Sequence, residues 1–221
     1  MSDRKITTVI FDLDGTLLDT LEDLKNATNY ALKLCGMPVR TLDEVRRFVG
    51  NGVKNLMIRA VPDGEDNPQF ERAFDAFKDY YAVHCNDATR AYDGISELLQ
   101  ELKNNGYAMA IVSNKIDSAV QDLNNRYFSQ VDVAIGDREC LRRKPEPDSV
   151  FLALEELGRT KEEAVYVGDS DVDLATAKNA GLPCISVLWG FRDKAFLIEH
   201  GAQTFVETPM EIADVLKQMN Q

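Results

Sequence analysis

Two aspartates, Asp12 and Asp14, follow the hydrophobic run "VIF" and are separated only by Leu13. Because side chains alternate along an extended chain, both carboxylates can point to the same side, and Gly15 then permits a sharp turn. Carboxylates this close repel each other, and one would hold a proton unless a divalent cation lay beside them. The pair therefore indicates a metal site, although an aspartate-rich turn that caps a helix would use the same residues.

Other polar side chains follow later hydrophobic runs. Ligands of open parallel sheets bind outside the carboxyl ends of the strands, so these side chains are expected to meet there. Oxygen ligands suit Mg2+, and Mn2+ is not distinguished from it by the sequence. We expect Asp12 and Asp169 as direct ligands, with the Asp14 carbonyl as a further oxygen. The remaining candidates are Ser113 and Asn114 after "AMAIV", Lys144 in "LRRKPEPD", and Asp173 in "GDSDVD".

Asp169 is expected at the start of the helix "SDVDLATAKNAG", with Asp173 on the same face and Asp171 turned away. Asp173 is then either a ligand or a residue behind the ligands.

Each of these groups also has a simpler interpretation. Ser113 and Asn114 could cap the next helix, and Lys144, beside Arg142 and Arg143, could belong to a solvated basic loop. Asp171 is interpreted as an exposed acid in the first turn of a helix. Four separate strand ends each carry a polar or charged side chain of the type that a metal and phosphate site needs, which favours such a site over capping alone.

The elements that must position these residues alternate between strands and helices. Short hydrophobic runs rich in β-branched residues predict strands at 6–11, 107–113, 131–135, 164–168 and 183–188. Segments with helical periodicity lie between the later strands, and Gly106, Gly158 and Gly181 mark helix ends. This order predicts an α/β fold with a parallel sheet covered on both faces.

Residues 20–87 interrupt that rhythm with several amphipathic helical patterns. We therefore predict two domains, an α/β core formed by residues 1–19 and 88–221 and an all-helical cap inserted after the first strand. A cap attached by two connections beside the first strand could act as a lid.

The composition excludes several kinds of partner. Thirty-seven acidic and twenty-five basic residues give a net charge of -12, which disfavours nucleic acid. No apolar run is long enough to span a membrane and no signal peptide is recognisable, so a cytoplasmic location is expected. The four cysteines are scattered, which indicates reduced thiols. Without a heptad pattern, a monomer is the default expectation.

The motifs "FDLDGTLLDT", "VSN", "RKPEPD" and "VGDSDVD" occur in the order found in the haloacid dehalogenase superfamily of phosphohydrolases, which this chain resembles over essentially its whole length. The resemblance implies a Rossmann-like core with a helical cap. It also implies that Asp12 is a nucleophile that forms an aspartyl phosphate, and that Asp14 is the general acid and base. Ser113 and Lys144 would bind the phosphoryl group, and Mg2+ would bridge Asp12 and substrate. An aspartate at position 14 disfavours dehalogenation.

The segment "VGNGVKNLMIRAV" (49–61) resembles the cap of phosphoglycolate phosphatases, as do "SNK" (113–115) and "WGF" (189–191). This implies a phosphatase for a small phosphate ester, with 2-phosphoglycolate as the best candidate. The substrate would contact Gly15, Asn114 and Lys115 in the core and Gly50, Asn51 and Gly52 in the cap. A helix end followed by a new helix start would explain the cap glycines equally well.

A sugar phosphomutase of the same superfamily is the alternative activity. A binding protein that retains the fold without turnover is the alternative from another class. The cap segment lacks the pattern of the mutases, and all four chemical positions carry competent residues.

Overall fold

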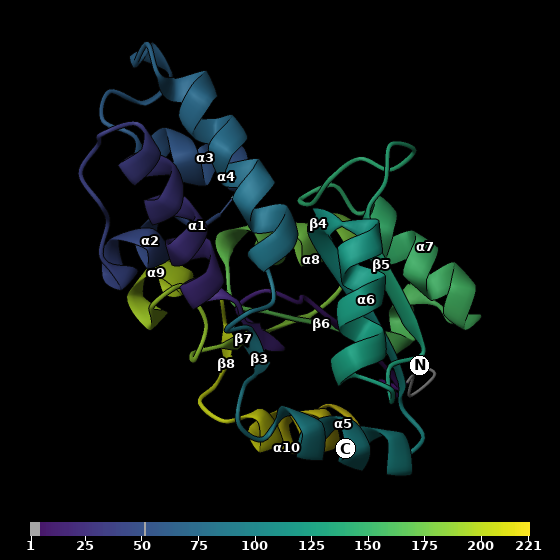
Figure 1. Cartoon of the computed structure of the whole chain (residues 1–221). Coiled ribbons are helices and arrows are strands. Elements are labelled where there is room, and N and C mark those ends of the chain that lie inside the picture. Colours follow the sequence, from purple (N-terminus) through teal and green to yellow (C-terminus); the bar gives the residue numbers. More distant parts are fainter. Residues whose placement is uncertain (1–4, 51) are drawn as a thin grey trace. The chain divides into compact units, whose positions relative to one another are not determined.

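The computed structural model describes residues 5–50 and 52–221, and its larger unit is built on a six-stranded parallel sheet (Figure 1). The strand order β5-β4-β1-β6-β7-β8 places the first strand near the centre. In β1, Thr8 lies opposite Ala108 of β4 on one side and Ala164 of β6 on the other. The strands are β1 (Thr8–Phe11), β4 (Ala108–Ile116), β5 (Val133–Asp137), β6 (Ala164–Gly168), β7 (Cys184–Val187) and β8 (Thr204–Val206).

Helices cover both faces of this sheet. Consecutive side chains of the central strands, which point to opposite faces, are therefore all buried. On one face, Ile10, Val112 and Tyr166 form a buried cluster with residues of α7 and α8. α5 contacts β4 and α10 contacts β8, and these two helices also pack on each other. The helices of this unit are α5 (Ile95–Asn104), α6 (Asp117–Tyr127), α7 (Asp148–Leu157), α8 (Asp171–Ala180), α9 (Lys194–Glu199), α10 (Pro209–Met219) and the short 3-10 helix η2 (Lys161–Glu163).

The predicted α/β fold with a parallel sheet is confirmed, and strand 164–168 has the expected bounds. β4 continues to Ile116, so Ser113 lies within the last part of the strand and not after it. The sequence did not predict β8, α9 or α10. β8 has only three residues, Thr204–Val206, which is too short for a periodic pattern to show.

A second compact unit, Leu18–Arg90, is predominantly helical. The predicted insert, 20–87, lies inside this unit. α1 and α4 pack together, and Phe70, Ala73 and Phe77 recur at helical spacing on the buried side of α4. The elements are β2 (Leu18–Asp19), α1 (Leu21–Leu34), α2 (Leu42–Phe48), α3 (Gly52–Ala60), the 3-10 helix η1 (Gly64–Asp66) and α4 (Phe70–His84); β2 pairs with β3 (Arg90–Ala91).

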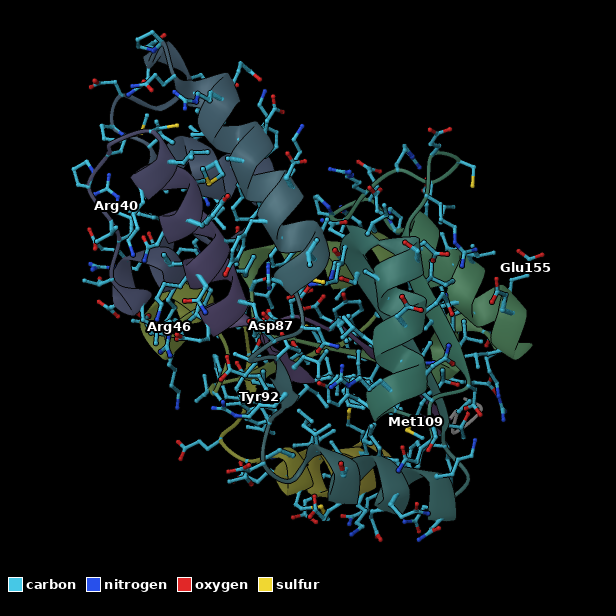
Figure 2. The ribbon with its side chains drawn as sticks, viewed as in Figure 1. Arg40, Arg46, Asp87, Tyr92, Met109 and Glu155 are labelled. Atoms are coloured by element: carbon cyan, nitrogen blue, oxygen red, sulfur yellow. The ribbon has the colours of Figure 1, made fainter. Side chains whose placement is uncertain are left out.

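Charged side chains such as Arg46 on α2 and Glu155 on α7 lie on the outside of their units (Figure 2). Among the described residues, no helix combines the length and the apolar character needed to cross a membrane. Cys35, Cys85, Cys140 and Cys184 are free thiols.

A buried carboxylate joins the two ends of the helical unit. Asp23 on α1 is 1% exposed and accepts hydrogen bonds from the backbone N–H groups of Ala88 (2.9 Å) and Thr89 (2.8 Å) and from the Thr89 hydroxyl (2.8 Å). Charge-assisted hydrogen bonds of this kind are stronger than neutral ones, and a buried N–H without a partner is costly. Asp23 therefore fixes the segment that follows α4 against the start of α1.

We predict that Asp23→Ala lowers the free energy of unfolding by about 3 kcal/mol, because it leaves buried donors without an acceptor. The control is Asp75→Ala, since Asp75 forms an exposed ion pair with Lys78 and its loss should cost less than about 1 kcal/mol. Urea denaturation of both variants measures the difference. Equal midpoints for the two variants would contradict the prediction, because the Asp23 hydrogen bonds would then contribute no more than the exposed ion pair of Asp75.

Candidate active site

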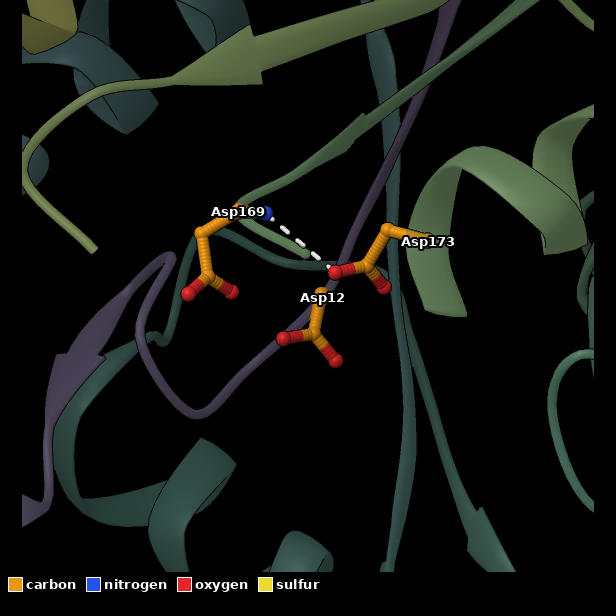
Figure 3. A group of neighbouring side chains, drawn as sticks. All are labelled: Asp12, Asp169 and Asp173. Atoms are coloured by element: carbon orange, nitrogen blue, oxygen red, sulfur yellow. Dashed lines mark hydrogen bonds between the residues drawn. The ribbon is translucent and has the colours of Figure 1, made fainter. Parts of the chain in front are cut away.

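Parallel strands end at a common edge of the sheet, and the side chains that follow them meet there. Asp12 follows β1, Asp169 follows β6, and Asp173 lies in the first turn of α8. One carboxylate oxygen from each residue lies within 4.8 Å of the others, and all three residues are buried. Figure 3 shows the three carboxylates gathered around one point. The structure thus brings together the predicted Asp12, Asp169 and Asp173.

The route by which Asp169 reaches this point differs from the prediction. α8 begins at Asp171 with Ser170 as its N-cap, so Asp169 precedes the helix and does not share a helix face with Asp173. The Ser170 hydroxyl donates to Oδ2 of Asp173 at 2.6 Å, and the Asp169 N–H donates to the same oxygen at 3.2 Å. Asp171, interpreted as an exposed acid, is half-buried with Oδ1 3.6 Å from Nε of Arg192.

Lys144 places its ammonium among the carboxylates. Nζ donates to Oδ1 of Asp12 at 2.6 Å and to Oδ1 of Asp173 at 2.8 Å. Further contacts join Nζ to the Tyr166 hydroxyl at 2.9 Å and to the Val112 carbonyl oxygen at 3.3 Å. Lys144 is 7% exposed, so the interpretation as a solvated basic loop does not apply to it.

Hydrogen bonds and ion pairs hold the loop that carries Lys144 in place. Asn114 accepts from the Lys144 N–H at 2.9 Å and donates to the Lys144 carbonyl at 3.0 Å. Arg142 and Arg143, whose side chains are exposed, form ion pairs with Asp148 and Asp137. The structure thus places both amide atoms of Asn114 on the lysine backbone, while the substrate contact expected of Asn114 stays a prediction.

Asp169 is enclosed by backbone that only glycine can provide. Oδ2 accepts from the Phe191 N–H at 2.7 Å, and Oδ1 lies 3.4 Å from the Thr16 hydroxyl. Gly15 has a φ of 92°, and a Cβ there would lie 2.5 Å from Oδ2 of Asp169. A Cβ on Gly190 would lie 2.3 Å from Cβ of Asp169. Both glycines are therefore required by close approach to this carboxylate.

Asp14 occupies a different environment from Asp12. Its Oδ1 lies 3.0 Å from Nζ of Lys115, and its side chain is 25% exposed, compared with 10% for Asp12. Ser113 is buried, and its hydroxyl accepts from the Lys115 N–H at 3.1 Å. The two aspartates thus have separate cationic partners, Lys144 for Asp12 and Lys115 for Asp14.

Burial and like charge raise the pKa values of the carboxylates. Desolvation, followed by the charge of Asp173, raises the pKa of Asp12 well above its ordinary value. The same causes raise the pKa of Asp169 to about 7. Desolvation would lower the pKa of Lys144, but the charges of Asp12 and Asp173 outweigh it and raise that pKa. The negative charge of the cluster exceeds what Lys144 supplies, and the donors are oxygens, so the site fits a hard divalent cation such as Mg2+.

The cap glycines lie in the helical unit. α2 ends at Phe48 and α3 begins at Gly52, so the segment has the local form of one helix end followed by a new helix start. Gly50 and Gly52 have φ values of 124° and 86°. Arg59 on α3 holds this turn, with Nη1 2.6 Å from the Phe48 carbonyl oxygen and 3.1 Å from that of Gly50. Asn51 lies outside the described residues, and a substrate contact by this segment stays a prediction.

Sequence reasoning missed Tyr166, whose hydroxyl contacts both Lys144 and Asp173. A possible signal was a tyrosine within the otherwise apolar strand "AVYVG", because a buried phenol needs a hydrogen-bond partner. Trp189, the first residue of the segment "WGF", donates from Nε1 to the Thr16 carbonyl at 3.0 Å.

We predict that Mg2+ raises the Tm of the protein more at about pH 8 than at about pH 6. The pKa of Asp169 is raised to about 7, so below this pH the cation must displace a proton. One pH unit below the pKa costs about tenfold in affinity. Between the ordinary pKa of 3.8 and about 7 the folded state holds more protons than the unfolded chain, so the stability of the metal-free protein falls as pH rises.

Thermal denaturation at both pH values, with Mg2+ and with chelator, measures these effects. Asp169→Asn serves as the control, because it removes the titrating group and should remove most of the Mg2+ effect. An equal Tm increase at both pH values would contradict the assignment of Asp169 as a Mg2+ ligand with a raised pKa.

Known proteins resemble this chain in sequence and in fold. A phosphoglycolate phosphatase of Pseudomonas aeruginosa is 33% identical to this chain. The alignment covers 96% of this chain and 77% of that protein. An N-acetylmuramic acid 6-phosphate phosphatase of the same organism is 31% identical and covers 98% and 97% of the two chains. A crystal structure from Lactobacillus delbrueckii subsp. bulgaricus, provisionally described as a phosphoglycolate phosphatase, superimposes with a TM-score of 0.91 at 34% identity, covering 96% and 98%.

Residues 9–187 match the family model described as haloacid dehalogenase-like hydrolase. This match spans more than half of the chain and includes Asp12, Ser113, Lys144 and Asp169. The chain belongs to the haloacid dehalogenase-like hydrolase family.

Proposed function

We propose that the protein is a Mg2+-dependent phosphatase that hydrolyses a small organic phosphate monoester through an aspartyl phosphate on Asp12. The observation that carries this proposal is the buried Asp12 carboxylate, 2.6 Å from the Lys144 ammonium and grouped with Asp169 and Asp173. With Lys144 and a bound Mg2+ offsetting the burial of Asp12, its carboxylate would be ionised, and an ionised carboxylate is suited to nucleophilic attack. The names of the related phosphatases support the same reaction class.

In the first step, a carboxylate oxygen of Asp12 forms a bond to phosphorus while the bond from phosphorus to the ester oxygen breaks. The leaving oxygen takes a proton from the Asp14 carboxyl group, so the alcohol departs neutral. Asp14 is suited to this role because it lies two residues from Asp12 and is more exposed to an entering substrate. Lys144 and the Ser113 hydroxyl offset charge on the phosphoryl oxygens.

In the second step, the Asp14 carboxylate takes a proton from a water molecule, and the water oxygen forms a new bond to phosphorus. The bond from phosphorus to Asp12 breaks, inorganic phosphate leaves, and Asp12 and Asp14 regain their initial states. Asp12 and Asp169 would be direct ligands of Mg2+, and the Asp14 carbonyl oxygen would be a further ligand. Asp173 would not bind the ion itself but would support the residues that do. When bound, Mg2+ supplies positive charge that offsets the charge of the nucleophile and of the phosphate.

For the substrate, we propose 2-phosphoglycolate. The cap segment 49–61 and the related phosphatases support this choice, and Lys115 in the core offers an ammonium to a second anionic group. Gly15, Gly50 and Gly52 would bring backbone close to such a small molecule. The relative that acts on N-acetylmuramic acid 6-phosphate makes that compound the first alternative to include in a test.

We predict Mg2+-dependent phosphate release from 2-phosphoglycolate in a panel of phosphate esters, and its loss on chelation. Asp12→Asn should abolish turnover at every pH because the amide cannot attack phosphorus. The matched control is Asp132→Asn, since Asp132 is also an ion-paired aspartate of this unit but pairs with Lys103 outside the site. Substantial residual turnover by Asp12→Asn would exclude the covalent route.

The same assay separates the alternatives. An isomerised sugar phosphate in place of inorganic phosphate would identify a mutase. Tight substrate binding without any product would identify a protein that has lost turnover.

We also predict that Arg59→Lys raises KM about fivefold for 2-phosphoglycolate and leaves kcat nearly unchanged. A lysine cannot reproduce the guanidinium contacts with both carbonyl groups, and one lost hydrogen bond is worth about 1 kcal/mol. Arg47→Lys is the control, because Arg47 forms an exposed pair with Asp43 on α2. Steady-state kinetics measure both variants, and an unchanged KM in Arg59→Lys would contradict a role of this turn in substrate binding.

A further inference from the structure

Tyr166 is a polar residue in the most buried part of the core. It lies at the centre of β6 between the aliphatic Val165 and Val167, and its side chain is fully buried. Its ring belongs to the cluster that packs under α7 and α8. A buried phenol loses its hydration, so its hydroxyl must find partners inside the protein.

The partners of the hydroxyl fix the direction of each hydrogen bond. The oxygen lies 2.9 Å from Nζ of Lys144 and 3.0 Å from Oδ1 of Asp173. An ammonium group has no acceptor, so the tyrosine oxygen accepts from Lys144. The O–H therefore donates to the Asp173 carboxylate. Burial raises the pKa of Tyr166 well above its ordinary value, so the hydroxyl retains its proton.

Asp173 is a rigid support for this hydroxyl because both of its oxygens are occupied. Oδ1 accepts from Tyr166 and Lys144, while Oδ2 accepts from the Ser170 hydroxyl and from the N–H groups of Ser170 and Asp169. These five donors exceed the roughly four lone pairs that the two oxygens of a carboxylate offer. The orientation of Asp173 is thus determined by groups other than Asp12.

Lys144 has three N–H donors and meets four acceptors, of which the Val112 carbonyl is the most distant at 3.3 Å. The charge of Asp12 provides the shortest contact, at 2.6 Å. That charge is lost whenever Asp12 is esterified by a phosphoryl group. The contacts with Tyr166 and Asp173 then become the restraints that keep the ammonium directed at the reacting group.

We propose that Tyr166 is a positioning residue for Lys144, whose hydroxyl, anchored on Asp173, holds the lysine ammonium in place while Asp12 changes its charge. The kinetic consequence rests on the proposed phosphatase activity. The geometric consequence does not, because it concerns Lys144 in the resting protein.

Tyr166→Phe tests the proposal, since it keeps the ring and removes only the hydroxyl. We expect kcat to fall about ten- to a hundredfold, the range expected for a misplaced catalytic group, with KM within about twofold. Tyr107→Phe is the matched control, because it removes another tyrosine hydroxyl of the same unit, one that accepts from Asn220 at 3.2 Å. Tyr107→Phe should retain the wild-type kcat.

A second measurement is independent of turnover. The buried Lys144 ammonium should give a side-chain 15N–1H NMR signal protected from solvent exchange, identified by its absence in Lys144→Ala. We expect Tyr166→Phe to broaden or abolish this signal and Tyr107→Phe to leave it intact. An unchanged signal in Tyr166→Phe, or a kcat within about twofold of wild type, would overturn the proposal. If the wild-type protein releases no phosphate from any ester, the proposed function fails and the signal alone decides the role of Tyr166.

Discussion

The charge imbalance among Asp12, Asp169, Asp173 and Lys144 is the constraint on which the site depends. The sheet brings these carboxylates to one edge, where burial strengthens their mutual repulsion and raises the pKa values of Asp12 and Asp169. The Lys144 ammonium compensates part of this charge. The remaining negative charge, carried by oxygen donors, suits the site to a hard divalent cation.

The surrounding residues hold this unfavourable arrangement in place. Gly15 and Gly190 let backbone approach Asp169, and Asn114 ties the Lys144 loop to β4. The Ser170 hydroxyl accepts from the Asp173 N–H as the N-cap of α8, and it orients Asp173 by donating to its Oδ2. Residues such as Ser170 and Asn114 therefore stabilise local structure and also position the charged side chains. The same sequence pattern is for this reason compatible with helix capping and with a functional site.

Features that depend on local pattern could mostly be predicted from the sequence. Asp12 and Asp169 could be placed because each comes directly after a hydrophobic run, and parallel strands share an edge. Tyr166 and the fastening role of Asn114 could not, because they depend on contacts with Lys144 from elements far apart in the chain. Of the expectations for Asp169, only the helix face shared with Asp173 was wrong, because Ser170 is the N-cap of α8 and Asp169 precedes the helix. β8 was not predicted, because three residues are too few to show the alternating pattern of a strand.

The chain enters its helical unit at Leu18 and leaves it at Arg90, whereas Asp12, Lys144, Asp169 and Asp173 all belong to the other unit. Recombination at these two junctions would replace the helical segment without altering any of the connections that hold the charged cluster. Natural selection could thus exchange the accessory module while preserving the reactive machinery, and a protein engineer has two defined splice points for the same purpose.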